Sequence, residues 1–244
     1  MKPQTKNLVL VLLLSIATIA CSDQSVISSS PTAGIAPEAS ITAGPSSAPV
    51  ESRPSSSVES EAFKAVLLNK ADFISTDATK KDVKLEEFLT NEDIFGTTFS
   101  VTHFTVVDMD SDGKPEIVLE LTPSLSEHPE FYEVLHYMEG NVYGYIQVYR
   151  GLLGLKADGT FGFSGGVSHF GYGKLKFDSS ASQMEIVAEY TAYENAEVFT
   201  IGNKSVAEQA FRFFSKEQDE KTDVVWHEFS EENMNTMLDS PNGS

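Results

Sequence analysis

A long segment without aromatic residues most restricts what this chain can fold into. Residues 22–60 are rich in Ser, Pro, Ala, Gly and Thr and contain no Phe, Tyr or Trp. Such a segment buries too little apolar surface to offset the entropy lost on ordering it. We therefore expect residues 21–60 to be a disordered tether with a typical reach of about 35 Å, and residues 240–244 to be a disordered tail. Residues 61–239 are left to form the globular domain.

The segment before the tether has the pattern of an export signal. Lys2 and Lys6 precede an apolar run that begins at Leu8 and continues to Ala20. A positively charged start, a short apolar stretch and small residues at its end are typical of a secretory signal peptide. The run of about 13 residues is too short to span a hydrocarbon core comfortably, since spanning takes about 20. We expect residues 1–20 to be cleaved.

The end of that segment resembles the lipobox of bacterial lipoproteins. Thr18, Ile19 and Ala20 stand directly before Cys21, the only cysteine of the chain. In such proteins the cysteine is diacylated, and two acyl chains provide an anchor that one chain does not. The resemblance implies lipidation of Cys21 and a position on the extracytoplasmic face of the cell membrane. An ordinary signal peptide followed by a free cysteine is the alternative.

Charge and cysteine content exclude several kinds of partner and site. The chain has 17 Lys and Arg residues against 36 Asp and Glu residues, a formal net charge of −19. A protein that binds nucleic acid needs a basic face, so nucleic acid is not expected as a partner. A single cysteine allows neither an internal disulfide nor a multi-cysteine metal site.

Hydrophobic periodicity divides residues 61–239 into helical and strand-like parts. Apolar residues spaced by three and four predict a helix over residues 59–76 and a short one over 84–89. Alternating β-branched and aromatic residues then predict strands. The predicted strands are 97–107, 116–122, 132–137, 142–149, 160–163, 173–177, 185–193 and 196–201.

Turn and capping residues complete the predicted fold. The dipeptides Gly140-Asn141, Asp158-Gly159 and Gly202-Asn203 favour antiparallel hairpins between consecutive strands. Ser205 and Ser230 each have the pattern of a helix N-cap, which predicts two C-terminal helices. We expect a single α+β domain whose body is a largely antiparallel β-sheet, with an N-terminal helix and C-terminal helices.

One acidic loop carries the clearest chemistry in the chain. Residues 108–116 have the pattern D-x-D-x-D-G-x-x-E. Ca²⁺ takes six to eight hard oxygen ligands, and a glycine at the sixth place permits the turn that brings them together. The expected ligands are the side chains of Asp108, Asp110, Asp112 and Glu116 and the carbonyl oxygen of Lys114. The alternative is an acidic, solvated hairpin turn.

The flanking residues decide which kind of calcium loop this resembles. The first nine positions resemble an EF-hand loop, but position twelve is Leu119 where an EF-hand has a bidentate Glu. Strand patterns lie on both sides, so the loop looks more like those that join two strands in integrin-type FG-GAP repeats. That resemblance implies a structural calcium ion in a β-hairpin and no helix-opening switch.

Two other patterns are weaker. Residues 162–166 match the G-x-S-x-G pattern around Ser164, but the helix that a nucleophile elbow requires does not follow. Ser164 and the nearby His169 are therefore only weak catalytic candidates. The remaining histidines lack the spacing of a zinc site, and His103 and His136 fit packed or rim positions. The aromatic residues between 132 and 172 fit cross-strand pairs better than a face that binds sugar or peptide.

Three stretches, at residues 130–137, 149–152 and 155–161, look like a group of uncharacterised secreted lipoproteins of low-GC Gram-positive bacteria. The resemblance implies a surface location and a shared fold, and it implies no reaction. The sequence thus predicts a membrane-anchored extracytoplasmic lipoprotein with a calcium-stabilised domain. We expect a non-catalytic binding or envelope-associated module whose ligand or protein partner the sequence does not identify. The alternatives are a secreted hydrolase acting on cell-wall or exogenous polymer, and a partner module such as a transporter accessory or adhesin.

Overall fold

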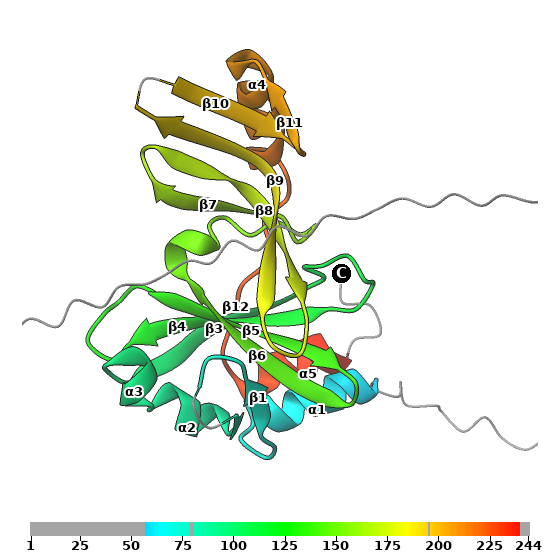
Figure 1. The fold of residues 1–244 in the computed structure, drawn as a ribbon. Helices are drawn as coiled ribbons and strands as arrows, with labels where there is room; N and C mark the ends of the chain where they lie inside the picture. The colour runs from blue at the N-terminus through cyan, green and yellow to red at the C-terminus, as the bar shows by residue number, and fades with distance from the viewer. Residues whose placement is uncertain (1–56, 79–80, 195, 240–244) are drawn as a thin grey trace, which may run out of the picture. The chain divides into compact units, whose positions relative to one another are not determined.

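A computed structural model describes residues 57–78, 81–194 and 196–239. The predicted signal peptide, Cys21, most of the tether and the tail 240–244 lie outside these residues. The described residues belong to one compact unit with bounds at residues 50 and 244. They form an α+β fold of largely antiparallel β-sheet, as the sequence predicts, and the strands are divided between two sheets (Figure 1). In this described part, no helix is long and apolar enough to cross a membrane.

The larger sheet has seven strands in the order β12-β3-β4-β5-β6-β1-β2. All neighbouring strands are antiparallel except β1 and β6, which are parallel. Its central four strands follow one another along the chain as hairpins. The bounds are β1 (Phe73–Ser75), β2 (Asp82–Val83), β3 (Phe99–Val107), β4 (Glu116–Pro123), β5 (Phe131–Met138), β6 (Asn141–Val148) and β12 (His227–Glu228).

The smaller sheet is fully antiparallel, with five strands in the order β11-β10-β9-β8-β7. The bounds are β7 (Phe161–Gly166), β8 (His169–Phe177), β9 (Ser182–Tyr193), β10 (Ala196–Ile201) and β11 (Lys204–Val206). A 3-10 turn, η1 (Tyr149–Gly151), and a loop lead from β6 into β7. Consecutive strands from β3 to β6 and from β7 to β11 therefore form hairpins, but the prediction of a hairpin is wrong between β6 and β7.

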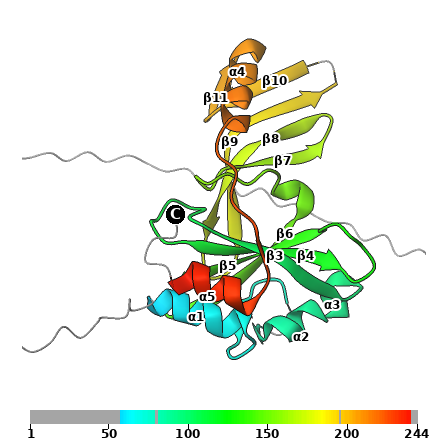
Figure 2. The same ribbon diagram turned by 180° about the vertical axis from the view of Figure 1, so that it is seen from behind.

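The helices cover one face of each sheet. Their bounds are α1 (Val58–Leu67), α2 (Leu85–Leu89), α3 (Glu92–Phe95), α4 (Glu208–Asp219) and α5 (Glu231–Asp239). Helices α1 and α5 lie side by side against the seven-stranded sheet, and α4 lies on the five-stranded sheet (Figures 1 and 2). An ion pair between Lys64 and Asp239 joins α1 to α5. Phe63, Val66, Met234 and Leu238 bury the facing surfaces of these two helices.

The seven-stranded sheet is buried on both faces. Alternate residues of β4, such as Ile117 and Leu119, belong to the core beneath α1 and α5. Val118 points to the other face, where a second core joins this sheet to the β6–β7 connection and to β7 and β8. Its buried members are Val107, Met109, Val118, Tyr132, Val134, Leu152, Leu155, Phe161, Leu175 and Val224. Met109, in the hairpin loop between β3 and β4, is one of these residues, so the second core fixes this loop to the sheet.

The predicted first helix is too long. Helix α1 ends at Leu67, and the backbone amides of Asn69, Lys70 and Ala71 bond back to carbonyls of the last turn. Asn69 has a φ of 56°, the left-handed conformation that commonly ends helices and that Asn tolerates better than most residues. The apolar residues beyond it belong to β1, which pairs with β6.

The two predicted caps of the C-terminal helices have different outcomes. Ser205 lies in β11, paired with Thr200 of β10, so the capping box at Ser205 is wrong, and α4 has Ala207 at its N-cap. Ser230 does cap α5, because its hydroxyl accepts a 3.3 Å hydrogen bond from the amide of Asn233.

Candidate functional site

The candidate site is the loop that joins β3 to β4. Asp108 follows β3 directly and Glu116 begins β4, where it pairs with Val107. Two residues of the loop have positive φ, Ser111 at 63° and Gly113 at 88°. Gly113 adopts its conformation without the cost that a Cβ would add. The loop is thus a hairpin connection between strands, as the flanking patterns predict.

Three aspartates of this loop come together. The carboxylates of Asp108, Asp110 and Asp112 each offer an oxygen, and these oxygens lie within 4.8 Å of one another. One oxygen of each carboxylate also folds the loop. Asp108 Oδ2 accepts from the amide of Gly113 at 3.1 Å, Asp110 Oδ1 from Asp112 at 3.0 Å, and Asp112 Oδ1 from Lys114 at 2.7 Å. The other oxygen of Asp108, Oδ1, is buried and has no hydrogen-bond partner within the described ranges.

Three lysine side chains connect the loop to neighbouring elements. Lys174 Nζ donates to Ser111 Oγ at 2.8 Å, and Lys176 Nζ donates to the carbonyl of Asp110. Lys114 Nζ pairs with Glu59 Oε1 of α1 at 2.9 Å, and this hydrogen bond raises the pKa of Lys114. These contacts are to a hydroxyl, a carbonyl and a helix carboxylate. The lysines therefore fix the loop to β8 and α1 without these contacts using an aspartate carboxylate.

Glu116 faces the protein interior and is fully buried. Its Oε2 accepts from the amide of Met109 at 2.7 Å, and its Oε1 lies 2.8 Å from His136 Nδ1. Burial raises the pKa of Glu116, and the hydrogen bonds from His136 and Met109 oppose that rise. Ligand atoms of Asp110, Glu116 and His136 also lie within 4.8 Å of one another. Two possible ligand groups therefore share Asp110.

For His136, the sequence pattern predicts only a packed or rim position. His136 is 6% exposed and stacks on Phe177 with ring centroids 4.8 Å apart. The register of β4 on β5, with Ile117 opposite Leu135, brings it to Glu116, twenty residues earlier in the chain. The packed position is thus right, and the contact with Glu116 follows from strand pairing that the sequence does not specify.

The two groups suit different ions. Three aspartate carboxylates supply the hard oxygen ligands that Ca²⁺ takes, and the orphaned oxygen of Asp108 fits a ligand atom. The group with His136 mixes nitrogen and oxygen, the donor set of borderline metals. Both oxygens of Glu116 already have protein partners, whereas Asp108 keeps one without a partner among the residues described. The aspartate group therefore fits a cation better.

Ser164 and His169 do not form a catalytic pair. Ser164 Oγ accepts from Arg150 Nη2 at 2.9 Å, while His169 Nε2 lies 3.3 Å from Glu189 Oε2. They stand at the end of β7 and the start of β8, so the G-x-S-x-G segment enters a hairpin, where a nucleophile elbow would enter a helix. Within the described part of the chain, no hydrogen bond joins the two side chains. This geometry agrees with the sequence analysis, in which Ser164 and His169 are only weak catalytic candidates.

Comparisons of the chain with protein-family models, with curated proteins and with solved structures gave no match. The residues of the site form a preshaped, anionic hairpin loop fixed on a buried sheet.

Proposed function

We propose that this protein is a membrane-anchored extracytoplasmic lipoprotein whose globular domain is stabilised by one Ca²⁺ in the β3–β4 loop. The domain serves as a non-catalytic binding or envelope-associated module. The observation that carries the calcium proposal is the convergence of Asp108, Asp110 and Asp112, together with the buried and unpartnered Oδ1 of Asp108 among the described residues.

Electrostatics supports an ion in the loop. Two unit charges at the 4.8 Å limit repel each other by about 1 kcal/mol in water and by about 3 kcal/mol at the effective dielectric of a protein surface. Hydrogen bonds from Gly113, Asp112 and Lys114 hold the three carboxylates in place despite this repulsion. A divalent cation replaces the repulsion with attraction, and the folded loop binds it without a large ordering cost.

The same contacts favour a structural role over catalysis. Each aspartate carboxylate of the loop either accepts a hydrogen bond that folds the loop or can bind a metal ion as a ligand. Both oxygens of Glu116 already have hydrogen-bond partners, Met109 and His136. The hydrolase alternative, an enzyme that acts on a polymer, calls for two carboxylates about 5–9 Å apart in an aromatic-lined cleft. A serine hydrolase needs a nucleophile and a base in contact, and Ser164 and His169 have separate partners, Arg150 and Glu189.

The anchoring part of the proposal depends on residues 1–21, which lie outside the described residues. Its support is the lipobox-like sequence that ends at Cys21 and the tether composition of residues 22–60. A lipid-anchored domain on a tether is free to meet ligands near the membrane surface.

Thermal unfolding of the full chain in detergent, with 10 mM CaCl₂ or with a chelator, tests the calcium proposal. A site with a dissociation constant of about 1 mM, typical of extracellular modules, adds about 1.4 kcal/mol of stability at this concentration. The expected rise in melting temperature is about 3–6 °C. The double variant Asp108→Asn/Asp112→Asn should lose the rise.

The matched control is Glu127→Gln/Glu130→Gln, which removes two charges from exposed positions between β4 and β5. It should keep the full calcium response. A response that is equal in all three proteins would mean that calcium acts on the general surface charge and would contradict the site.

A further inference from the structure

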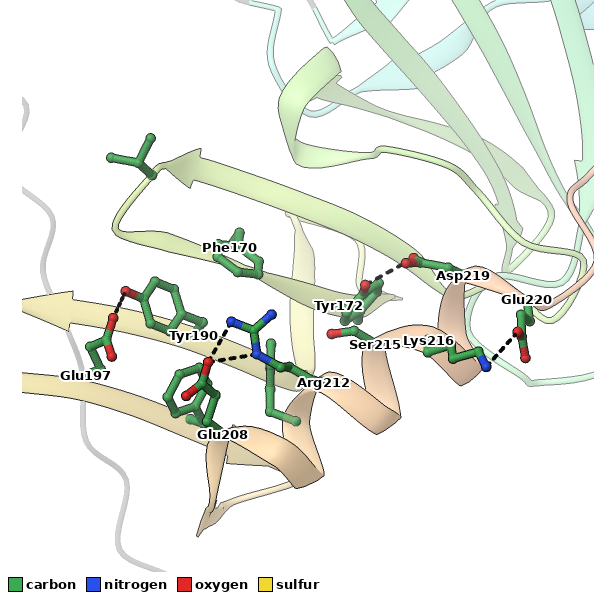
Figure 3. Close-up of a pocket in the computed structure, with 13 residues that line it drawn as sticks. Phe170, Tyr172, Tyr190, Glu197, Glu208, Arg212, Ser215, Lys216, Asp219 and Glu220 are labelled. Atoms are coloured by element: carbon green, nitrogen blue, oxygen red, sulfur yellow. Dashed lines mark hydrogen bonds and ion pairs between the residues drawn. The ribbon is translucent and has the colours of Figure 1, made fainter.

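A groove is lined by α4 and by the strands that α4 covers. It has a volume of about 690 Å³ and lies over β8, β9 and β10 (Figure 3). Volumes of this size are typical of ligand sites. A second cavity of about 320 Å³ reaches toward β7 and shares Phe170, Tyr172 and Asp219 with the first. The two together form an elongated surface, separate from the β3–β4 loop.

Aromatic rings form the floor of this groove. Phe170 of β8, Tyr190 of β9 and Phe199 of β10 lie in a row across the strands, with neighbouring ring centroids 5.0 Å apart. Phe211 of α4 contacts Phe199 at 5.4 Å. Phe170 lies at the β8 end of this row and is 38% exposed. The floor thus offers ring faces to a ligand.

The acidic side chains of the groove outnumber its basic ones. Four carboxylates line it, from Glu197, Glu208, Asp219 and Glu220, against the two basic groups of Arg212 and Lys216. Arg212 pairs with Glu208 at 2.6 Å and Lys216 with Glu220 at 3.6 Å, so α4 neutralises both of its own cations. Two carboxylates, those of Glu197 and Asp219, remain.

These two carboxylates have no cationic partner among the residues that the structure describes. Glu197 Oε1 accepts from the hydroxyl of Tyr190 at 2.9 Å, and Asp219 Oδ1 accepts from the hydroxyl of Tyr172 at 3.1 Å. Lys156 lines the second cavity, but its Nζ donates to the backbone carbonyl of Asp219 and pairs with Asp223. The tyrosines hold the carboxylates in place and leave their charge uncompensated.

Figure 3 shows Glu197 and Asp219 at opposite ends of the groove, with Tyr190, Phe170 and Tyr172 between them. A fitting ligand therefore carries two cationic groups joined by an extended linker that lies on aromatic rings. Cations are attracted to ring faces and to carboxylates alike. An extended peptide with spaced Lys or Arg side chains has this form, and its length matches the elongated surface better than a compact amine does.

We propose that this groove binds an extended basic peptide segment of a partner protein. Its cationic side chains lie against Glu197 and Asp219, and its alkyl stems lie on Phe170 and Tyr190. The inference deepens the proposed binding role by giving the ligand class, and it rests on that role but uses none of the calcium ligands.

Fluorescence anisotropy with a labelled heptapeptide, Lys-Ala-Ala-Lys-Ala-Ala-Lys, tests the proposal on the full chain in detergent. Salt at 0.15 M screens attraction between distant exposed charges, which is needed for a chain of charge −19. The lysine peptide should bind at least tenfold more tightly than the same peptide with Gln in place of Lys. The variant Glu197→Gln/Asp219→Asn should weaken binding about tenfold, and Phe170→Leu about threefold.

The matched control is Glu185→Gln/Glu217→Gln, at exposed positions of β9 and α4 that do not line the groove. It should bind within twofold of the unchanged protein, and melting curves establish that each variant is folded. Equal weakening in control and groove variants, or equal binding of the Gln peptide, would overturn the proposal. Complete displacement of the peptide by an equal concentration of 1,6-diaminohexane would assign the groove to a small amine and overturn the peptide assignment.

The calcium proposal is tested separately in the same experiment. The variant Asp108→Asn/Asp112→Asn should still bind the lysine peptide, because neither residue lines the groove. Absence of peptide binding by a protein that keeps its calcium-dependent melting shift would overturn the groove inference alone.

Discussion

Asp108 and Gly113 close the β3–β4 loop through a 3.1 Å hydrogen bond from the Gly113 amide to Asp108 Oδ2. The bond leaves Asp108 Oδ1 buried and, as far as the described residues show, without a partner. A buried carboxylate oxygen without a partner costs free energy that a ligand can recover. On the calcium proposal, the cation binds a loop that is already folded, which favours a stabilising ion over a switch.

A second buried carboxyl, that of Glu133, lies away from this loop. Glu133 is fully buried on β5, and neither of its oxygens has a hydrogen-bond partner in the described part of the chain. Burial, together with repulsion from Asp77, raises the pKa of Glu133 well above its ordinary value. The folded protein therefore keeps Glu133 protonated over a pH range in which the unfolded chain releases the proton.

This difference makes stability depend on pH. The contribution of Glu133 is fully present below its ordinary pKa of 4.5 and is lost as pH rises toward the raised folded pKa, by up to about 1.4 kcal/mol for each pH unit. Gln cannot ionise, so Glu133→Gln should equal the unchanged protein at pH 4 and exceed it by at least about 1 kcal/mol at pH 7. Urea unfolding at the two pH values measures this.

Glu127→Gln, at an exposed position, is the control for that experiment and should differ little from the unchanged protein at either pH. A Glu133→Gln variant whose stability difference is the same at pH 4 and pH 7 would show that Glu133 has no raised pKa.

Gly144 makes room for Glu133. A Cβ at Gly144 would lie 2.2 Å from Glu133 Oε1 and 2.4 Å from Phe73 Cε2, both in the core. Gly144→Ala should therefore destabilise the protein by about 1–3 kcal/mol, the usual cost of overpacking a core. Gly162→Ala is the control, because its Cβ would meet its neighbours at ordinary contact distances of 3.4 Å and more. Equal stability of the two variants in urea unfolding would show that the space around Gly144 is not tight.

Cys21 is expected to carry the anchor. In a bacterial host, the unchanged chain should incorporate labelled palmitate and sediment with membranes. Cys21→Ser removes the acylated thiol, so the label and the membrane association should both be lost. Palmitate labelling that persists in Cys21→Ser would place the acyl chain elsewhere, and a soluble unchanged protein would contradict the anchor.

The local sequence pattern predicts most strands but not the pairs between distant segments. Strand β5 forms where the pattern predicts a strand, although residues 132–136 are all buried, and its hairpin with β6 turns at Glu139 and Gly140, which both have positive φ. The apolar spacing that continues to Ile74 predicts a helix there, but these residues form strand β1, in which Ile74 pairs with Tyr143 of β6. The positive φ of Asn69, rather than the hydrophobic stripe, decides where α1 ends.

The same limit applies to the sites. Asp108, Asp110 and Asp112 are close in sequence, so their convergence follows from one local turn. His136 reaches Glu116 only through the β4–β5 register. The groove beneath α4 is formed by β8, β9, β10 and α4 together. The sequence predicts its aromatic residues only as cross-strand pairs, which they also are, and does not predict that they line a groove.

Calorimetric titration of the full chain in detergent with CaCl₂ shows whether the β3–β4 loop holds a single calcium ion. We expect one ion per chain with a dissociation constant of about 1 mM or tighter, and no such binding by Asp108→Asn/Asp112→Asn. Absence of binding up to 10 mM, or equal binding by the double variant, would rule out the calcium site and leave the loop an acidic hairpin turn.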